Sequence, residues 1–157
     1  MAIPKKLLKF LDENKVKYEV VEHRKVYTAH DSAKTQKIDP KTVVKTLVMK
    51  LDKDYALAMV PANKNLDKAK FKKLAKPAKK VDLAKEAWMK KNILGKVGAT
   101  PPFGSLMKLP VYIDAPLLKN KELIVSSGEY TESIKIKTKD FEKLEPDFIK
   151  GSFSQKK

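Results

Sequence analysis

Residues 43–50 read Val-Val-Lys-Thr-Leu-Val-Met-Lys, and this stretch decides how the chain is organised. It is apolar or β-branched apart from its lysines, which is typical of a buried strand. Side chains alternate between the two faces of a strand, so Lys45 shares one face with Leu47 and Met49. Such a lysine projects into a cleft or against an anion, or it lies on an edge strand and prevents aggregation. The spacing leaves both interpretations open.

The patterns on either side of this stretch predict one α+β domain with a mixed sheet flanked by helices. Helices and strands are interspersed, and the turn at residues 51–54 joins two strands in a hairpin. We expect the domain to span residues 1–150 and residues 151–157 to form a frayed tail. The predicted helices are 3–13, 28–35, 65–76 with Asn65 as its cap, 83–92 and 141–144. The predicted strands are 16–20, 43–50, 55–60, 111–114, 122–126 and 133–138.

The charge of the chain points to a polyanionic partner. The formal net charge is +16, and Arg24 is the single arginine among 35 basic residues. Nucleic acid is the first candidate, and lysine favours phosphate contact over the reading of bases. Lysine enrichment also accompanies thermophily without any nucleic-acid role, so this alternative stays open.

The composition excludes several kinds of site. There is no cysteine, so a disulfide framework, a thiol nucleophile and a thiolate metal site are absent. His23 and His30 have no third ligand at a suggestive spacing, so we expect neither a metal nor a cofactor. No apolar run is long enough to cross a bilayer and the first residues lack a signal peptide's apolar core, which predicts a cytoplasmic protein without a membrane partner.

Lysines are concentrated between Lys64 and Lys91. This run holds eleven lysines and three acidic residues, which is a local net charge of +8. A solvated helix face is the usual explanation for such charge. The near absence of compensating acids favours a phosphate-binding surface instead. The residues expected to contact phosphates are Lys68, Lys72, Lys73 and Lys76.

A glycine- and proline-rich loop covers residues 98–104, Gly-Ala-Thr-Pro-Pro-Phe-Gly. The glycines permit unusual backbone angles, and the prolines stiffen the middle of the loop. A rigid loop of this kind can direct backbone N–H groups at an oxyanion or an ester carbonyl. It can equally be a plain connector, and the sequence alone does not separate the two.

Several motifs resemble, in their order, those of the YbaK/ProX family of aminoacyl-tRNA deacylases, which is related to the editing domain of bacterial prolyl-tRNA synthetases. The most specific pair is V-V-K-T-L-V at residues 43–48 with G-x-x-x-P-F-G at residues 98–104. The resemblance extends from the first helix to about Leu144. Further matches are Glu22-His23, Tyr27-Thr28-Ala29, Val60-Pro61-Ala62, Val111-Tyr112-Ile113-Asp114 and Val125-Ser126-Ser127-Gly128.

The resemblance implies a mixed, partly curled sheet and hydrolysis of the ester between a wrong amino acid and its tRNA. It implies that Lys45 lies near the 3′-terminal adenosine and that the loop from Gly98 to Pro102 borders the aminoacyl group. Lys45 and Gly98 are therefore the expected catalytic residues. The expected substrate-binding residues are Tyr27, Thr28, His30, Thr46, Ala99, Thr100, Pro101, Pro102, Phe103, Gly104, Ser126, Ser127 and Gly128.

This chemistry agrees with the residues themselves. An ester is already activated, so a site needs mainly placement and stabilisation of the oxyanion, which a cation and backbone N–H groups supply. The nucleophile is then water or a group of the substrate. We expect aminoacylated tRNA as partner, with prolyl-tRNA synthetase as a second one. Relatives that clear alanine from proline tRNA have asparagine after the lysine; Thr46 here favours cysteine or another small amino acid.

Three alternatives remain. The first is a non-catalytic tRNA- or synthetase-binding module of the same fold, which needs neither Lys45 nor the loop at residues 98–104. The second is a lysine Schiff-base enzyme acting on a small carbonyl compound. The third is a general nucleic-acid binder, which would not prefer aminoacylated over bare tRNA. His30 stands where many relatives have glutamate, and its effect on the pocket is open.

Overall fold

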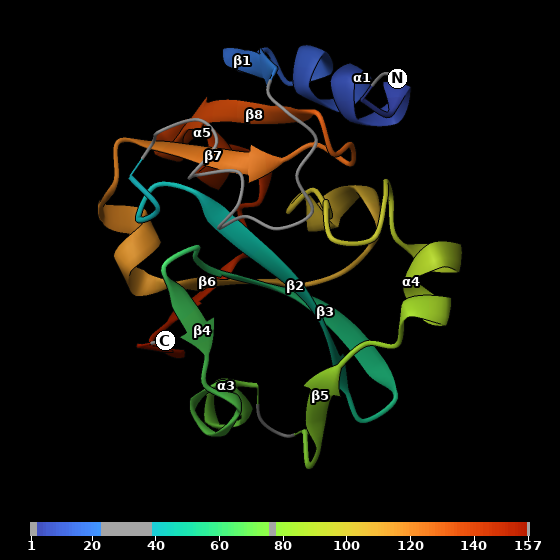
Figure 1. Cartoon of the computed structure of the whole chain (residues 1–157), viewed down its shortest axis with the longest axis vertical. Helices are drawn as coiled ribbons and strands as arrows, with labels where there is room; N and C mark the ends of the chain where they lie inside the picture. Colours follow the sequence, from blue (N-terminus) through green and yellow to red (C-terminus); the bar gives the residue numbers. More distant parts are fainter. Residues whose placement is uncertain (1–2, 23–38, 76–77, 157) are drawn as a thin grey trace.

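The computed structural model describes residues 3–22, 39–75 and 78–156 (Figure 1). The helix predicted at residues 28–35 lies outside these ranges. The described strands are β1 Tyr18–Glu22, β2 Val44–Leu51, β3 Asp54–Pro61, β4 Lys64–Leu66, β5 Val81–Leu83, β6 Val111–Asp114, β7 Glu122–Ser126, β8 Glu132–Lys137, β9 Ile149–Gly151 and β10 Ser154–Lys156. The helices are α1 Lys5–Glu13, α3 Lys68–Leu74, α4 Glu86–Asn92 and α5 Thr138–Leu144, with short 3-10 helices η1 Gly104–Leu106 and η2 Ala115–Lys119.

The strands form a five-stranded sheet, a three-stranded sheet and a two-stranded ribbon. The five-stranded sheet has the order β5-β2-β3-β6-β9, and the three-stranded sheet has the order β1-β8-β7. In the larger sheet β2 pairs antiparallel with β3 and β5, whereas β6 pairs parallel with β3 and β9. The predicted α+β class with a mixed sheet is therefore confirmed. None of the helices in the described ranges is long and apolar enough to cross a membrane.

The hairpin of β2 and β3 has the predicted turn. The strands pair from Val44 opposite Pro61 to Leu51 opposite Asp54, so Asp52 and Lys53 alone make the bend. Asp52 has a φ of 58°, a left-handed conformation that aspartate tolerates better than most residues. The turn fixes the register of the hairpin, and with it the faces on which the β2 side chains lie.

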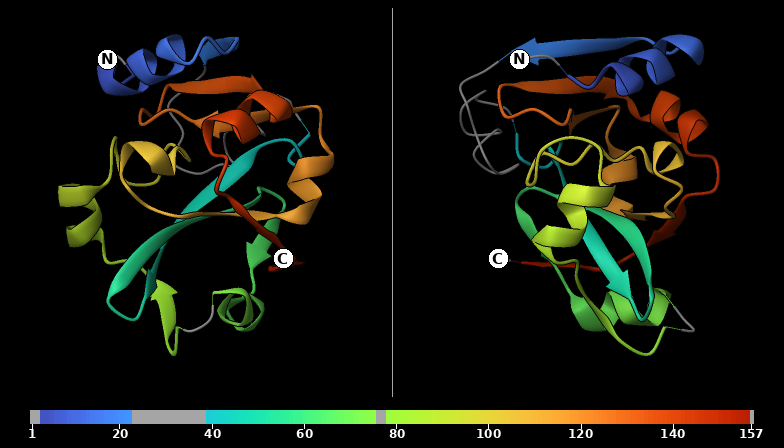
Figure 2. Two further views of the ribbon diagram at one scale, coloured as in Figure 1. Left: turned by 180° about the vertical axis from the view of Figure 1, so that it is seen from behind. Right: turned by 90° about the vertical axis from the view of Figure 1, so that its right-hand side faces the viewer.

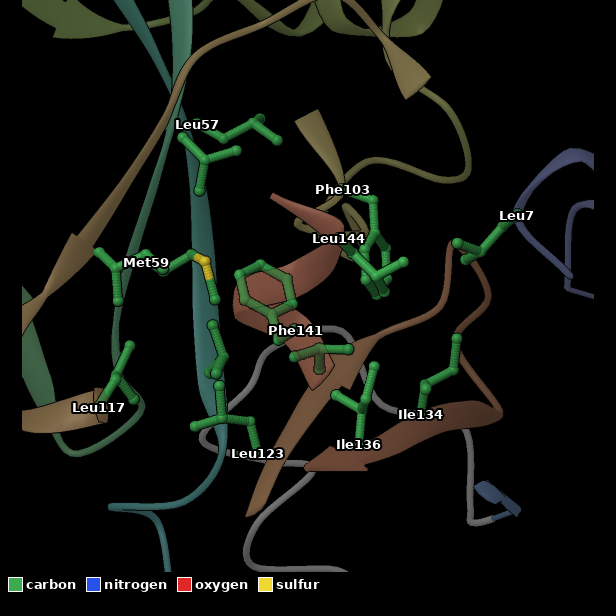
Figure 3. Packing of buried hydrophobic residues seen from close by; sticks show 14 of the residues in the cluster. Leu7, Leu57, Met59, Phe103, Leu117, Leu123, Ile134, Ile136, Phe141 and Leu144 are labelled. Carbon is green, nitrogen blue, oxygen red and sulfur yellow. The ribbon is translucent and has the colours of Figure 1, made fainter. Parts of the chain in front are cut away.

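Strand β2 contributes to two hydrophobic clusters, one on each of its faces. Val44 and Val48 belong to a first cluster, which lies between the two larger sheets and includes α5 and the loop before η1. Met49 and Leu51 belong to a second cluster on the opposite face. Figure 3 shows the first cluster, with Phe141 lying between side chains of the two sheets. Strand β2 is therefore covered on both sides, as its apolar sequence predicts.

The two sheets divide the molecule into two ends. Figure 2 shows the three-stranded sheet and α1 at one end, and α3 and β5 at the other. An isolated parallel bridge between Val43 and Ile124 joins the start of β2 to β7. The backbone N–H of Ile124 also donates to the carbonyl of Thr42 at 2.9 Å. This junction is where the two sheets meet.

The helix predicted from residue 65 begins later and has a different cap. Asn65 lies in β4, and Asp67 is the N-cap, its carboxylate accepting from the backbone N–H of Lys70 at 3.1 Å. Both residue types favour N-caps, so local propensity could not separate them. Asn65 pairs instead with Gln155 of β10, which lies 90 residues further along the chain, and this pairing leaves Asp67 as the N-cap.

The helix predicted at residues 83–92 is also shorter. Residues 81–83 form β5, in which Leu83 pairs with Met49 of β2, and α4 begins at Glu86. Leu83 keeps 56% of its surface exposed, because it sits at the edge of the sheet. Trp88 of α4 stacks on Tyr55 of β3 with ring centroids 3.5 Å apart, so α4 covers this part of the hairpin.

The expected frayed tail is wrong for residues 151–156. Strand β9 crosses the expected boundary at residue 150, and β10 pairs antiparallel with β4. Phe153 is fully buried between them, its ring 5.3 Å from that of Phe71. Polar residues flank Phe153 in the sequence, and Phe153 is the buried aromatic residue of this segment. The polar composition of residues 151–157 therefore gave no indication of a strand.

Replacement of Phe153 should destabilise the folded protein if β10 is an integral strand. We expect Phe153→Ala to lower the free energy of unfolding by about 3–5 kcal/mol, because it empties a filled aromatic site. Urea unfolding measures this, with Phe148→Ala, at a partly exposed phenylalanine, as the matched control. Equal losses for the two variants would contradict the packing of the C-terminal strand.

Candidate active site

Lys45 lies near the start of β2, opposite Val60 of β3. It is partly exposed and shares the face of the second cluster with Leu47. Its ammonium donates to the side-chain carbonyl of Asn65 at 3.1 Å. Strand β5 pairs with β2 only from Met49 onward, so no described strand pairs with the other edge of β2 at Lys45. The lysine therefore lies at the rim of the sheet, on the border of an apolar face.

Strands β2 and β7 run in parallel from the bridge between Val43 and Ile124 and then diverge. Lys45 and Ser126 each lie two residues beyond this bridge, on their respective strands. Figure 1 shows β7 staying with the three-stranded sheet while β2 turns away from it. Lys45 and Ser126 thus lie close in sequence to this junction, and Thr46 follows Lys45 on the opposite face of β2.

The loop at residues 98–104 is firmly packed. Residues 99–104 are buried, and the Phe103 ring lies 6.1 Å from Phe10 of α1 and 5.5 Å from Phe141 of α5. Gly98 has a φ of 87°, and a Cβ on Gly104 would lie 2.3 Å from the carbonyl oxygen of Leu109. Both ends of the loop therefore need glycine, and its backbone groups are held in fixed positions.

The chain just before this loop is joined to the turn between β7 and β8. Gly95 and Gly128 approach so closely that a Cβ on Gly95 would lie 2.3 Å from the Gly128 Cα. The backbone N–H of Lys96 donates to the Gly128 carbonyl at 2.9 Å, and the Tyr130 hydroxyl donates to the carbonyl of Val97 at 2.5 Å. The segment that leads into the predicted loop is therefore held against Gly128, the last of the predicted residues 126–128.

Ser127 and an ion pair shape this turn. The Ser127 hydroxyl is buried and donates to the carbonyl of Glu132 at 2.7 Å. Lys96 approaches the buried carboxylate of Glu129 to 2.5 Å and thereby lowers the pKa of that carboxyl. Sequence analysis missed Lys96 and Glu129, because 33 residues separate them and neither belongs to a recognisable motif.

Thr46 has an unused polar group on the face of β2 opposite to Lys45. It is partly exposed, but its hydroxyl oxygen is buried and has no hydrogen-bond partner in the described part of the chain. A buried hydroxyl without a partner costs about 1–3 kcal/mol, so native structures rarely keep one without reason. A substrate group is one partner that this hydroxyl can accept.

Glu145 holds the far end of the loop, and sequence analysis also missed it. Its carboxylate accepts from the backbone N–H of Ser105 in η1, at 3.1 Å through one oxygen and 3.3 Å through the other. Only 5% of Glu145 is exposed, and this burial raises the pKa of its carboxyl to about 7. A carboxyl that titrates near neutral pH therefore supports the segment that follows Gly104.

The basic surface is centred on α3, with Phe71 directed inward. Lys72 and Lys73 are exposed, whereas Lys68 pairs with Asp82 at 2.7 Å. Backbone N–H groups of Lys79 and Lys80 donate to Asp52 and lower the pKa of its carboxyl. A surface hollow of about 470 Å³ next to α3 is lined by Lys50, Asp52, Lys68, Lys80, Asp82, Leu83 and Lys85.

Four of the predicted site residues lie outside the described ranges, namely Tyr27, Thr28, His30 and Lys76. Both histidines of the chain, His23 and His30, also lie outside the described ranges. Among the residues that the structure does describe, no three side chains of His, Cys, Asp or Glu gather in a way that could hold a metal ion.

Comparison with known proteins identifies relatives. A family model described as "Aminoacyl-tRNA editing domain" matches residues 23–144. A candidate trans-editing enzyme for prolyl tRNA synthetase superposes with a TM-score of 0.84 at 21% identity, covering 99% of both chains. The crystal structure of a hypothetical protein, APE2540, superposes with a TM-score of 0.84 at 18% identity, covering 96% of this chain and 100% of the other. At these identities the structures establish the fold alone.

The raised pKa of Glu145 predicts a pH-dependent stability. The folded state keeps this proton up to about pH 7, whereas unfolded glutamic acid loses it near pH 4.5. The free energy of unfolding should therefore fall between pH 4.5 and 7, by up to about 3 kcal/mol. Glu145→Gln should remove this slope and stabilise the protein at pH 8.

Urea unfolding between pH 4.5 and 8 measures the effect. Glu142→Gln, which changes a partly exposed carboxylate on α5, is the control and should keep the wild-type slope. If the free energy of unfolding of Glu145→Gln still falls between pH 4.5 and 7, another titrating group causes the pH dependence.

Proposed function

Because the chain belongs to the aminoacyl-tRNA editing domain family, we propose that it is a trans-acting deacylase that hydrolyses the ester of a mischarged tRNA. Its preferred substrate is proline tRNA carrying cysteine or another small amino acid. One observation carries the proposal. Lys45 lies two residues beyond the bridge that joins the start of β2 to β7, and the turn after β7 is bonded to the segment that leads into the rigid loop at residues 98–104.

The reaction needs no nucleophile from the protein. Water adds to the ester carbonyl, the bond from the carbonyl carbon to the ribose oxygen breaks, and the amino acid leaves as its acid. The tRNA keeps the ribose oxygen as a hydroxyl, with a proton supplied by the water. Negative charge develops on the carbonyl oxygen, and both the Lys45 ammonium and fixed N–H groups of the loop from Gly98 stabilise such charge.

Neighbouring residues then bind the aminoacyl group. Thr46 follows Lys45 on the opposite face of β2, and we assign its buried hydroxyl, which lacks a partner in the described part of the chain, to the aminoacyl group. The buried loop residues from Ala99 to Gly104 supply a rigid wall, and Ser126 lies on β7 two residues beyond its bridge to the start of β2. Tyr27, Thr28 and His30 remain sequence-based predictions. A small apolar pocket separates close homologues weakly, which fits a substrate class better than one amino acid.

The tRNA is held by its phosphates. Lys72 and Lys73 on α3 are exposed, and the hollow beside them has four lysines and two aspartates. A surface of lysines binds by charge and shape without reading bases, which suits an enzyme that takes an acceptor stem. Association with prolyl-tRNA synthetase is part of the proposal, because a similar fold occurs in a candidate trans-editing enzyme for that synthetase.

Removal of the Lys45 ammonium tests the catalytic part. We expect Lys45→Ala to lower the deacylation rate at least about 100-fold, as loss of an oxyanion-stabilising group does elsewhere, while tRNA binding persists. The assay is release of amino acid from proline tRNA charged with cysteine, alanine, serine or proline. Lys53→Ala, in the exposed turn of the same hairpin, should behave like wild type.

If the wild-type protein binds these tRNAs and clears none of them, the non-catalytic binding module replaces the deacylase. If Lys45→Ala stays active, the ester is cleaved by other groups.

Removal of charge from α3 tests the binding part. The double variant Lys72→Ala with Lys73→Ala should weaken tRNA binding, and the slope of log Kd against log salt should fall by about 1–2, because each phosphate contact contributes about 0.9. Lys5→Ala with Lys6→Ala removes the same charge from α1, at the other end of the molecule. An equal change in both variants would show attraction by net charge alone.

A further inference from the structure

We propose that Asn65 is a positioning residue for the Lys45 ammonium, and that the C-terminal strand β10 holds Asn65 in place. The importance of this contact for catalysis rests on the proposed function, but the contact itself does not. Asn65 belongs to no motif of the sequence, and β10 lies beyond the segment that matches the family model, residues 23–144.

The first step is the direct contact. The Lys45 ammonium donates to the Asn65 side-chain carbonyl at 3.1 Å, between strands that are 20 residues apart in sequence. A long lysine side chain loses rotamer freedom when its end is fixed, so a fixed acceptor selects its direction. The acceptor is a neutral amide, so this contact does not itself neutralise the positive charge of the ammonium. A carboxylate there would neutralise that charge.

The second step is the support of β4. This strand has three residues, and within the described chain it pairs with β10, with Asn65 opposite Gln155. The backbone N–H of Asp67, just after β4, donates to the carbonyl of Phe153 at 2.7 Å. A strand this short depends on its neighbours for its position, so β10 determines where the Asn65 side chain lies.

The third step is the anchoring of β10. Asp114, at the end of β6, is fully buried and accepts from the backbone N–H of Phe153 at 2.9 Å and from the Ser154 hydroxyl at 2.5 Å. The ring of Phe153 packs edge-on against Phe71. A continuous set of contacts therefore runs from the buried carboxylate of Asp114 through β10 and Asn65 to the Lys45 ammonium.

Kinetics of three variants test the role in catalysis. Asn65→Ala should lower kcat for deacylation about tenfold, with KM for the charged tRNA changed less than about twofold. Asn65→Asp should lower kcat further than Asn65→Ala does, because its carboxylate competes with the substrate for the Lys45 ammonium. Gln155→Ala changes the cross-strand partner and should match wild type. Equal losses for Asn65→Ala and Gln155→Ala would reduce Asn65 to a structural element of the ribbon and overturn the proposal.

A second measurement does not need activity. Competitive acetylation with trace acetic anhydride, resolved by peptide mass spectrometry, reports the fraction of each lysine that is an uncharged amine. Asn65→Asp should lower the labelling of Lys45 several-fold at fixed pH, because a nearby carboxylate favours the ammonium. Asn14→Asp makes the same charge change at the end of α1 and should leave Lys45 unaffected.

The deacylation kinetics and the lysine labelling distinguish a failure of the Asn65–Lys45 contact from a failure of the proposed deacylase function. Unchanged labelling of Lys45 in Asn65→Asp overturns the contact, whatever the activity. Reduced labelling in a protein that clears no mischarged tRNA supports the contact and rejects the deacylase.

Discussion

Because apolar clusters cover both faces of β2, this strand cannot slip by one residue without turning Val44 and Val48 toward the wrong cluster. The constraint fixes more than the core. It sets which face carries Lys45, and it places the bridge at Val43 from which β2 and β7 separate. The candidate active site is therefore built near the bridge that joins the two sheets, by residues whose positions the core already determines.

The sequence predicted those parts of the fold in which local pattern and tertiary structure agree. Alternation and turn residues gave the β2–β3 hairpin, and helical spacing gave α1 with Leu7 and Leu11 buried. Lys45 and the loop at residues 98–104 stand out in the sequence because an ammonium in an apolar strand and glycines around prolines are locally unusual. The structure also joins the segment just before this loop to Gly128, a residue that only the resemblance had grouped with the loop.

What the sequence could not supply depends on partners far along the chain. Asp67 rather than Asn65 caps α3, and Phe153 makes a strand of residues that look like a polar tail. Glu145 reads as an ordinary surface carboxylate at the end of a helix, yet it is buried and supports the site loop. No local pattern distinguishes these residues, because burial by a distant segment gives each of them its role.

The ribbon of β4 and β10 also has a consequence for the order of folding. About 90 residues of chain separate the two strands, and synthesis at roughly 5–20 residues per second leaves β4 without its partner for several seconds. The β2–β3 hairpin, whose contacts are local, forms long before that. Until β10 is made, Phe71 lacks the Phe153 ring that packs on it in the native structure, and that apolar surface stays accessible to chaperones.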